Sequence, residues 1–399
     1  MSGMKIINAG WFIDGTGGPV RKNIRLHIQN KRIVSITDSG SGDTAEYGTT
    51  DFGSSTILPC LVDSHVHLCI SGTDDPVARE KQLDADFDKI KGLISDHIKR
   101  QLSYGVLAVR DGGDRFAYAL RYRNESLDIN KIPICIRVAG RAWYRAGRYG
   151  GLIGRPLQEN HSLAEAINND PEEKDHIKIV NSGLNSLKEF GKETLPQFGA
   201  GDLSDVVKIA AKYGRRVMVH ANGEKPVAVA LEAGCDSIEH GFFMGAENLK
   251  IMAEKKIVWV PTACTMKAYS EHMKPGSREA EVSRMNLDHQ LEQISKAREL
   301  GVTVALGTDS GSMGVHHGAA VIEELKLLIT AGYSLPEAIR CASCNGARLL
   351  GIKDVGVISK DMAATFIVAK GDPSKLPDSL RSLDFICFKG NFINCKDEI

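Results

Sequence analysis

Short apolar runs alternate with longer amphipathic segments along most of the chain. Eight apolar runs have the length of strands, at residues 57–62, 105–109, 132–138, 176–180, 216–219, 237–238, 257–260 and 302–306. Apolar residues recur at helical spacing in intervening and following segments such as 83–103, 202–213, 226–233, 283–300, 317–331 and 335–350. Strands that alternate with helices in this way indicate a parallel sheet, and eight such repeats predict an α/β fold of the (β/α)8 TIM barrel type.

The two ends of the chain have a different pattern. Before residue 58, β-type runs such as 24–28 and 31–36 alternate with glycine-containing turns, and similar runs return at 365–369 and 385–388. Each end alone is too short to bury a core of its own. We therefore expect the two ends to share one small sheet module beside the barrel.

Composition and charge limit the kinds of molecule that the protein is expected to bind. The chain has 399 residues, of which 42% are hydrophobic and 25% charged, which are ordinary values for a globular protein. Lys and Arg total 50, as do Asp and Glu, so no net charge attracts the protein to nucleic acid or to an anionic membrane. With neither a signal peptide nor a long apolar run, we expect a cytoplasmic homo-oligomer that acts on a small molecule.

Two histidines follow the first apolar run of the predicted barrel. In Leu58-Pro-Cys-Leu-Val-Asp-Ser-His65-Val-His67 they are two positions apart, so on a strand both side chains project to the same side. Two imidazoles that point at one place can ligate a metal ion. Taken alone, the motif is explained equally well by two ordinary surface or core histidines.

Three further strand ends carry potential metal ligands. The fifth run is followed by His220, the sixth by His240 and the eighth by Asp309. The chemistry of a (β/α)8 barrel lies at the carboxyl ends of its strands, so these side chains and the histidine pair would meet at one opening. Chance placement of all five residues at such ends is improbable, which favours a metal site.

A lysine lies inside the fourth apolar run. Lys178 is flanked by Ile177 and Ile179, and a bare ammonium group buried in a barrel is costly unless it is paired or modified. One alternative is an ion pair with a neighbouring carboxylate. The other is carboxylation by CO2, which would give a carbamate able to bridge two divalent cations and neutralise part of their charge.

The order His-x-His, Lys, His, His, Asp resembles the binuclear amidohydrolase superfamily over nearly the whole chain. Its imidazolonepropionase-related branch, which includes metal-dependent Xaa-Pro dipeptidases and arginine carboxypeptidases, is more similar still. The stretches that carry this similarity are Leu61-Val-Asp-Ser-His-Val-His67, Val109-Arg-Asp-Gly-Gly113, His220-Ala-Asn-Gly223, Asp236-Ser-Ile-Glu-His-Gly241, Gly307-Thr-Asp-Ser310 and Asn345-Gly-Ala-Arg-Leu-Leu-Gly351. The resemblance implies a barrel at residues 58–352 and a small β-sandwich domain built from residues 1–57 and 353–399.

The resemblance also implies two divalent cations, which we expect to be Zn2+. The implied ligands are His65, His67 and Asp309 for the more buried cation, His220 and His240 for the more exposed one, and N6-carboxylysine at Lys178 for both. In the implied mechanism a metal-bridging hydroxide attacks the carbonyl carbon, and Asp309 is the general base that passes the proton to the leaving nitrogen. We thus expect hydrolysis of an amide C–N bond in a small carboxylate-bearing substrate, such as a dipeptide or an N-acyl amino acid.

The loops at the strand ends are expected to contact the substrate. The candidates are Arg110, Tyr144, Arg145, Arg148, Tyr149, Asn181, Thr262 and His316. An arginine among them would bind a substrate carboxylate in a bidentate way, or alternatively the arginines pair with nearby acids. After the third run the chain departs from the dipeptidase pattern, because Leu152 takes the place of a histidine usual in those relatives.

Other functions use parts of the same pattern. A hydrolase of cyclic amides or a lactonase would use the same binuclear centre, whereas a deaminase of the single-metal kind does without the bridging lysine. A scaffold without catalytic activity would be expected to have lost ligands, and here all six positions are filled. Hydrolysis of a linear amide is therefore our main hypothesis.

Overall fold

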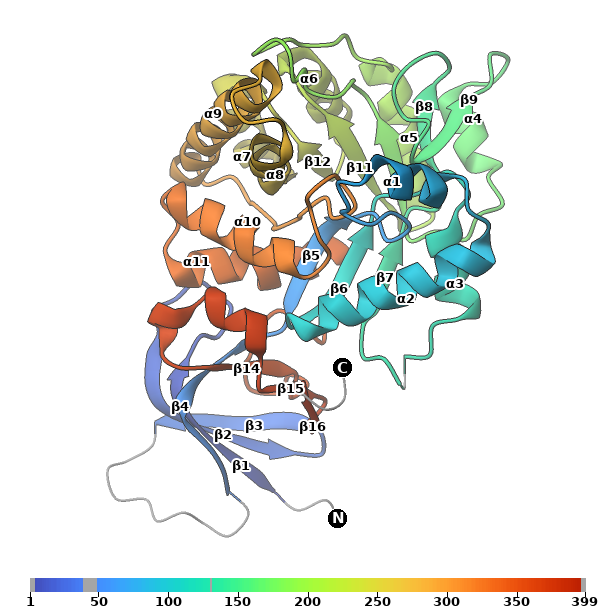
Figure 1. Ribbon diagram of the computed structural model, residues 1–399. Coiled ribbons are helices and arrows are strands. Elements are labelled where there is room, and N and C mark those ends of the chain that lie inside the picture. The colour runs from blue at the N-terminus through green and yellow to red at the C-terminus, as the bar shows by residue number, and fades with distance from the viewer. Residues whose placement is uncertain (1–3, 39–48, 130, 396–399) are drawn as a thin grey trace.

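Parallel strands and helices alternate through the middle of the chain, as the apolar pattern predicts. The computed structural model describes residues 4–38, 49–129 and 131–395 (Figure 1). Strands that overlap seven of the eight predicted runs are β5 (Leu61–Val66), β6 (Val106–Asp111), β7 (Cys135–Val138), β10 (His176–Val180), β11 (Arg216–Ala221), β12 (Ser237–His240) and β13 (Val258–Val260). Together with β8 (Ala142–Arg145) and β9 (Gly154–Leu157), they are hydrogen-bonded in a sheet of order β5-β6-β7 and a sheet of order β13-β12-β11-β10-β8-β9.

Irregular backbone connects the two sheets. The eighth predicted run forms an isolated bridge between Val304 and Trp259 of β13, and the amide of Trp259 donates to Thr303 O at 2.9 Å. On the other side of this segment, the amide of Ser64 in β5 donates to Leu306 O at 2.8 Å. Where β7 ends, the amide of Asp175 donates to Val138 O at 2.9 Å, next to the start of β10. The strands thus form a TIM-barrel-like α/β domain.

In the described part of the chain, twelve α-helices are distributed between and after the strands. They are α1 (Pro76–Leu83), α2 (Phe87–Ser103), α3 (Tyr118–Glu125), α4 (Leu163–Asn168), α5 (Ala200–Lys212), α6 (Glu224–Ala233), α7 (Gly245–Lys255), α8 (Cys264–His272), α9 (Arg278–Leu300), α10 (Ala319–Thr330), α11 (Leu335–Arg340) and α12 (Gly346–Leu350). Local sequence sets many of their ends. For α9, the hydroxyl of Ser277 accepts a hydrogen bond from the amide of Ala280, and Gly301 ends the helix with φ 76°.

The two ends of the chain form one sheet at the side of the barrel opposite α6 and α9 (Figure 1). Its strands, in spatial order, are β16 (Asn391–Asn394), β15 (Phe385–Phe388), β14 (Phe366–Lys370), β4 (Thr49–Pro59), β1 (Lys5–Phe12), β2 (Arg21–Gln29) and β3 (Arg32–Asp38). Within the described residues these strands make a single seven-stranded sheet, so the expected β-sandwich is not confirmed. The reason is β4, which pairs with β1 on one edge and with β14 on the other.

A separate apolar core lies in this sheet module. Ile7, Ile24 and Phe366 are buried in the same cluster, although they come from opposite ends of the chain. Neither end could bury these side chains alone, as expected from their lengths. None of the helices in the described part of the chain is long and apolar enough to span a membrane. The expected homo-oligomer and cytoplasmic location stay predictions.

Candidate metal centre and substrate cavity

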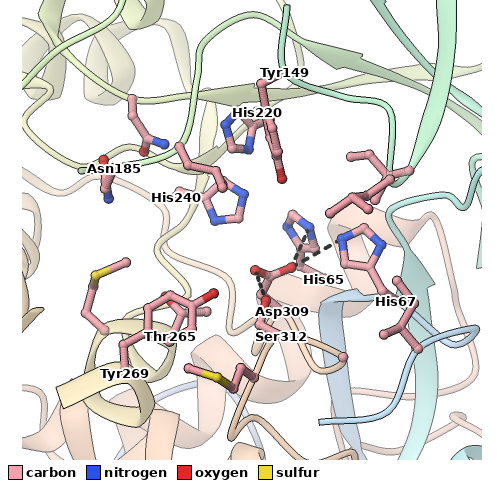
Figure 2. A pocket seen from close by; sticks show the side chains of 18 of the residues that line it. His65, His67, Tyr149, Asn185, His220, His240, Thr265, Tyr269, Asp309 and Ser312 are labelled. Atoms are coloured by element: carbon pink, nitrogen blue, oxygen red, sulfur yellow. Dashed lines mark hydrogen bonds and ion pairs between the residues drawn. The ribbon is translucent and has the colours of Figure 1, made fainter. Parts of the chain in front are cut away.

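Three of the predicted ligands meet at the carboxyl end of β5. The possible ligand atoms of His65, His67 and Asp309 all lie within 4.8 Å of one another. Asp309 Oδ1 is 3.4 Å from His65 Nε2 and 3.3 Å from His67 Nε2 (Figure 2). Two imidazole nitrogens and a carboxylate oxygen that face one point form a donor set suited to a divalent cation.

Backbone contacts hold this group in place. The amide of Asp309 donates to His65 O at 2.7 Å, and the amide of His67 donates to Ser310 O at 2.8 Å. Asp309 adopts a left-handed conformation with φ 56°, which is uncommon for a residue other than glycine. Nearby, a Cβ on Gly307 would lie 2.9 Å from His65 Cβ and 2.3 Å from Val260 Cγ1. A residue with no side chain is therefore required where the segment passes β5.

Hydrogen bonds at the far nitrogens orient both histidines. His65 Nδ1 donates to Glu239 Oε2 at 2.8 Å, and His67 Nδ1 donates to Gly113 O at 2.9 Å. Since these acceptors place the ring hydrogen on Nδ1, the lone pair of each imidazole is on Nε2, which faces Asp309. His65 Nε2 is buried and has no hydrogen-bond partner among the described residues. The arrangement fits a cation at this point.

Lys178 is buried at the bottom of the same opening. Its side chain on β10 is 1% exposed, and its Nζ has no hydrogen-bond partner within the described residues. Within the described residues, no carboxylate forms a salt bridge with this amine. The structure therefore does not support the alternative of an ion pair. Burial lowers the pKa of Lys178 to about 8. A substantial share of the amine is therefore neutral near physiological pH.

His220 and His240 lie beside this group, at the ends of β11 and β12. Their ring centroids are 4.6 Å apart, and the ring of His240 is 4.9 Å from that of His65. His220 Nε2 lies 3.1 Å from Gly183 O, and His240 Nδ1 lies 2.7 Å from Thr262 Oγ1. Burial lowers the pKa of His220 to about 4 and that of His240 to about 3. Both rings are thus neutral, and each keeps one nitrogen available to a cation.

Asp309 is ionised in this surrounding. Burial favours its neutral form, but its close contacts with His67 and the neighbouring histidines hold the pKa of the carboxyl well below its usual range. The hydroxyl of Ser312 donates to Asp309 Oδ2 at 2.9 Å and leaves Oδ1 facing the histidines. An ionised and oriented carboxylate suits both metal ligation and proton acceptance.

A cavity of about 370 Å³ opens onto all six predicted ligands. Much of its remaining wall is apolar, and these residues are Ile70, Leu152, Ile153, Leu184, Leu187, Phe242, Met266, Met273 and Met313. The other lining side chains are polar or aromatic, and they include Arg79, Tyr149, Asn185, Asn222, Thr265, Tyr269 and Ser312. Figure 2 shows Tyr149 and Tyr269 on opposite sides of the histidine group.

Of the predicted substrate contacts, Tyr149 lines this cavity, with its ring 5.4 Å from that of His220. Thr262 does not line it and instead holds His240. Asn181 is buried, and its Oδ1 accepts from the amide of Phe198 at 2.8 Å. His316 lines a different, smaller hollow.

The predicted arginines are engaged elsewhere. Arg110 is 2% exposed and binds Ser64 O, Ser237 Oγ and Glu239 Oε1 in the barrel interior. The segment expected to be a loop after the third strand contains β8 (Ala142–Arg145) and β9 (Gly154–Leu157), which extend the sheet. Arg145 there donates to Gln197 O and Arg148 to Leu195 O. These two arginines and Tyr144 are not among the residues that line the cavity.

Other residues of the site had no clear signal in the sequence. Glu239 precedes a predicted ligand, and only the fold shows that its carboxylate contacts His65. Arg79 and Tyr269 lie on α1 and α8, away from the apolar runs that guided the search for ligands. The periodic pattern identifies strand ends, whereas these residues reach the cavity through the way helices and loops fold over it.

Fold and site together define a class of protein, a TIM-barrel-like α/β protein in which a group of side chains that could hold a metal ion lies at the carboxyl ends of the strands. A model of the amidohydrolase family matches residues 56–394, so the chain belongs to that family. The expected family is confirmed, and with it the general activity of a hydrolase acting on C–N bonds.

Individual relatives are distant. An uncharacterized protein of Mycobacterium tuberculosis is 25% identical over 383 residues, which cover 95% of this chain and 94% of that protein. Ochratoxinase of Aspergillus niger is 29% identical over 178 residues, 44% of this chain and 36% of the relative. Among solved structures, a Xaa-Pro dipeptidase with methionine bound in its active site has a TM-score of 0.82 and 26% identity, and the match covers 98% of this chain and all of that one.

Proposed function

We propose that this protein hydrolyses an amide C–N bond in a small carboxylate-bearing substrate, such as a dipeptide or an N-acyl amino acid. The observation that carries the proposal is the meeting of four histidines, Asp309 and the buried Lys178 at one cavity of about 370 Å³. A dipeptidase among the structural neighbours and an ochratoxinase among the relatives support an amide as the bond that is cleaved.

The proposed cofactors are two divalent cations, Zn2+ being the metal that histidine and carboxylate ligands favour. His65, His67 and Asp309 would hold one, His220 and His240 the other, and Lys178 both. The unpartnered His65 Nε2 and Lys178 Nζ support this assignment, because a buried polar atom without a partner is costly. When bound, the cations supply an acidified water and polarise the carbonyl of the substrate.

We further propose that Lys178 is carboxylated. The neutral amine attacks CO2, an N–C bond forms and one proton leaves, so that the product is N6-carboxylysine, whose single negative charge is shared by two oxygens. The lowered pKa of Lys178, about 8, favours this reaction because the amine must be neutral to attack. Carboxylation would replace a buried positive charge with the negative charge that a pair of cations requires.

Asp309 is the proposed general base. Its ionised carboxylate would accept the proton of the attacking water and pass it to the leaving nitrogen. Ser312 fixes the orientation of the carboxylate through its hydrogen bond to Oδ2. Glu239 acts indirectly, since it fixes the tautomer of His65.

A substrate screen tests the proposal. Zinc-loaded protein is incubated with linear N-acyl amino acids, dipeptides, cyclic imides and lactones, and the release of amine or acid is measured. We expect turnover of linear amides, and we expect Asp309→Asn to remain folded but lose that turnover. Activity confined to cyclic substrates, or equal activity of the Asp309→Asn variant, would contradict the proposed reaction or the proposed base.

A further inference from the structure

The basic and acidic side chains that line the substrate cavity differ in whether they are available to a substrate. Among its lining residues in the described part of the chain, Arg79 is the single arginine, and Lys178 is the single lysine and is buried at the metal centre. Asp309 is the single carboxylate in that lining, and it is already bound to His67 and Ser312. The cavity therefore offers a cation to a substrate but no free carboxylate.

Arg79 is held in a way that leaves one edge of its guanidinium open. Its Nη1 donates to Ser71 O at 2.9 Å and to Gly311 O at 3.0 Å, which fixes the side chain between α1 and the segment that carries Asp309. Its Nε and Nη2 make no hydrogen bond with the described residues and belong to a side chain that lines the cavity. That edge of a guanidinium binds a carboxylate through two parallel hydrogen bonds.

Exposed apolar side chains form another part of the wall. Leu152 is 47% exposed and Leu184 is 58% exposed, and both line the cavity. Arg79 reaches the same cavity next to Ser312, since it binds Gly311. The cavity thus offers exposed apolar side chains and one guanidinium beside the proposed ligands.

We propose that the substrate is an N-acyl amino acid with a large apolar acyl group. Its carboxylate binds Arg79, its acyl group covers Leu152 and Leu184, and the amide carbonyl lies at the metal centre. A dipeptide has a free ammonium group, for which the described lining offers no spare carboxylate, so blocked substrates are preferred. The inference rests on the proposed amide hydrolysis, in which water gives OH to the acyl carbon and H to the nitrogen as the C–N bond breaks.

Matched substrates and variants test this inference. We compare N-benzoyl-L-leucine with its carboxamide, with N-acetyl-L-leucine and with phenylalanyl-leucine, using zinc-loaded wild-type protein and Arg79→Gln. Loss of a charge-assisted bidentate contact should reduce kcat/KM for N-benzoyl-L-leucine by about 10-fold to 100-fold, mainly through KM, and leave the carboxamide unchanged. Lys81→Gln is the control, because Lys81 is exposed on the same helix and does not line the cavity.

The arms of the experiment separate the possible roles of Arg79. Its Nη1 also holds backbone carbonyls, so a purely structural role would lower kcat for the acid and the carboxamide alike, and that result would overturn the assignment. Arg79→Lys should recover only part of the loss because an ammonium cannot form two parallel bonds. Turnover of phenylalanyl-leucine as fast as that of N-benzoyl-L-leucine would overturn the preference for blocked substrates.

The exposed apolar wall has its own variant. Leu184→Ser should reduce the preference of the enzyme for N-benzoyl-L-leucine over N-acetyl-L-leucine by about threefold to tenfold, because less apolar area is buried on binding. An unchanged preference would remove this wall from the proposed site.

A binding measurement distinguishes failure of the inference from failure of the proposed reaction. Calorimetry with N-benzoyl-L-leucine is carried out on wild-type protein and on Arg79→Gln. If the wild type binds it and the variant does not, Arg79 is a carboxylate site even if no amide in the panel is hydrolysed, in which case the proposed reaction is wrong. If neither protein binds it, the substrate inference is wrong.

Discussion

The replacement of Glu239 by glutamine tests how the metal centre is held. This carboxylate is fully buried and accepts three hydrogen bonds, from His65 Nδ1 at 2.8 Å, from Arg110 Nη2 at 2.7 Å and from Ser237 Oγ at 2.6 Å. Glutamine has the same shape but replaces one oxygen by an NH2 group. Since all three partners are donors, one of them must then face another donor.

The expected cost has two parts. Arg110 is 2% exposed and loses the carboxylate that neutralises it, and breaking such a buried pair costs about 3–5 kcal/mol of unfolding free energy. If the NH2 group faces His65, the ring must move its hydrogen to Nε2 to accept a bond at Nδ1. The lone pair that faces Asp309 is then lost. Removal of a group that orients a ligand lowers metal affinity by about 10-fold to 100-fold.

Two assays measure these effects separately. Urea unfolding of the metal-free protein gives the loss of stability, and competition with a chelator gives the zinc affinity of the folded protein. The double variant Arg110→Met with Glu239→Gln removes the buried cation as well and should recover much of the stability but not the affinity. Zinc affinity of Glu239→Gln equal to that of the wild type would refute the role of Glu239 in orienting His65.

Three further predictions follow from buried groups. Lys178→Ala should leave fewer than two zinc ions per chain by elemental analysis, and an unchanged count of two would remove the carbamate from the proposal. Activation of metal-free protein by bicarbonate and zinc should slow as the pH falls below about 8, the pKa of Lys178, because the protonated amine does not attack CO2; a rate independent of pH between 6 and 9 would contradict this reaction. Burial raises the pKa of Glu324 from 4.5 to about 7, so the folded protein binds more protons than the unfolded chain in this range, and this residue should make stability fall as the pH rises from 4.5 to 7. In urea unfolding at several pH values, Glu324→Gln should flatten that slope, and an identical slope would contradict the assignment.

Secondary structure could be predicted from the sequence because the apolar pattern of each segment, and the order of the segments along the chain, are local properties. The runs at 105–109 and 176–180 contain residues that the core buries, and they correspond to β6 and β10. The run at 302–306 has the same pattern but is joined to its neighbours by a few backbone hydrogen bonds and one isolated bridge, not by a regular ladder. Hydrogen bonding between distant segments decided that difference.

The sequence by itself determined which residues gather at the metal centre. A strand end is recognisable from a local pattern, and in a parallel barrel all the carboxyl ends face one opening, so His65, Lys178 and Asp309 could be brought together without coordinates. The local sequence does not show which arginine faces the substrate. Arg110 lies in the barrel interior, where it donates a hydrogen bond to Glu239, 129 positions away. Arg79 lies at the cavity, where it donates a hydrogen bond to the carbonyl of Gly311, 232 positions away. Only the tertiary structure decided between them, because contacts at such separations depend on how the whole chain closes around the site.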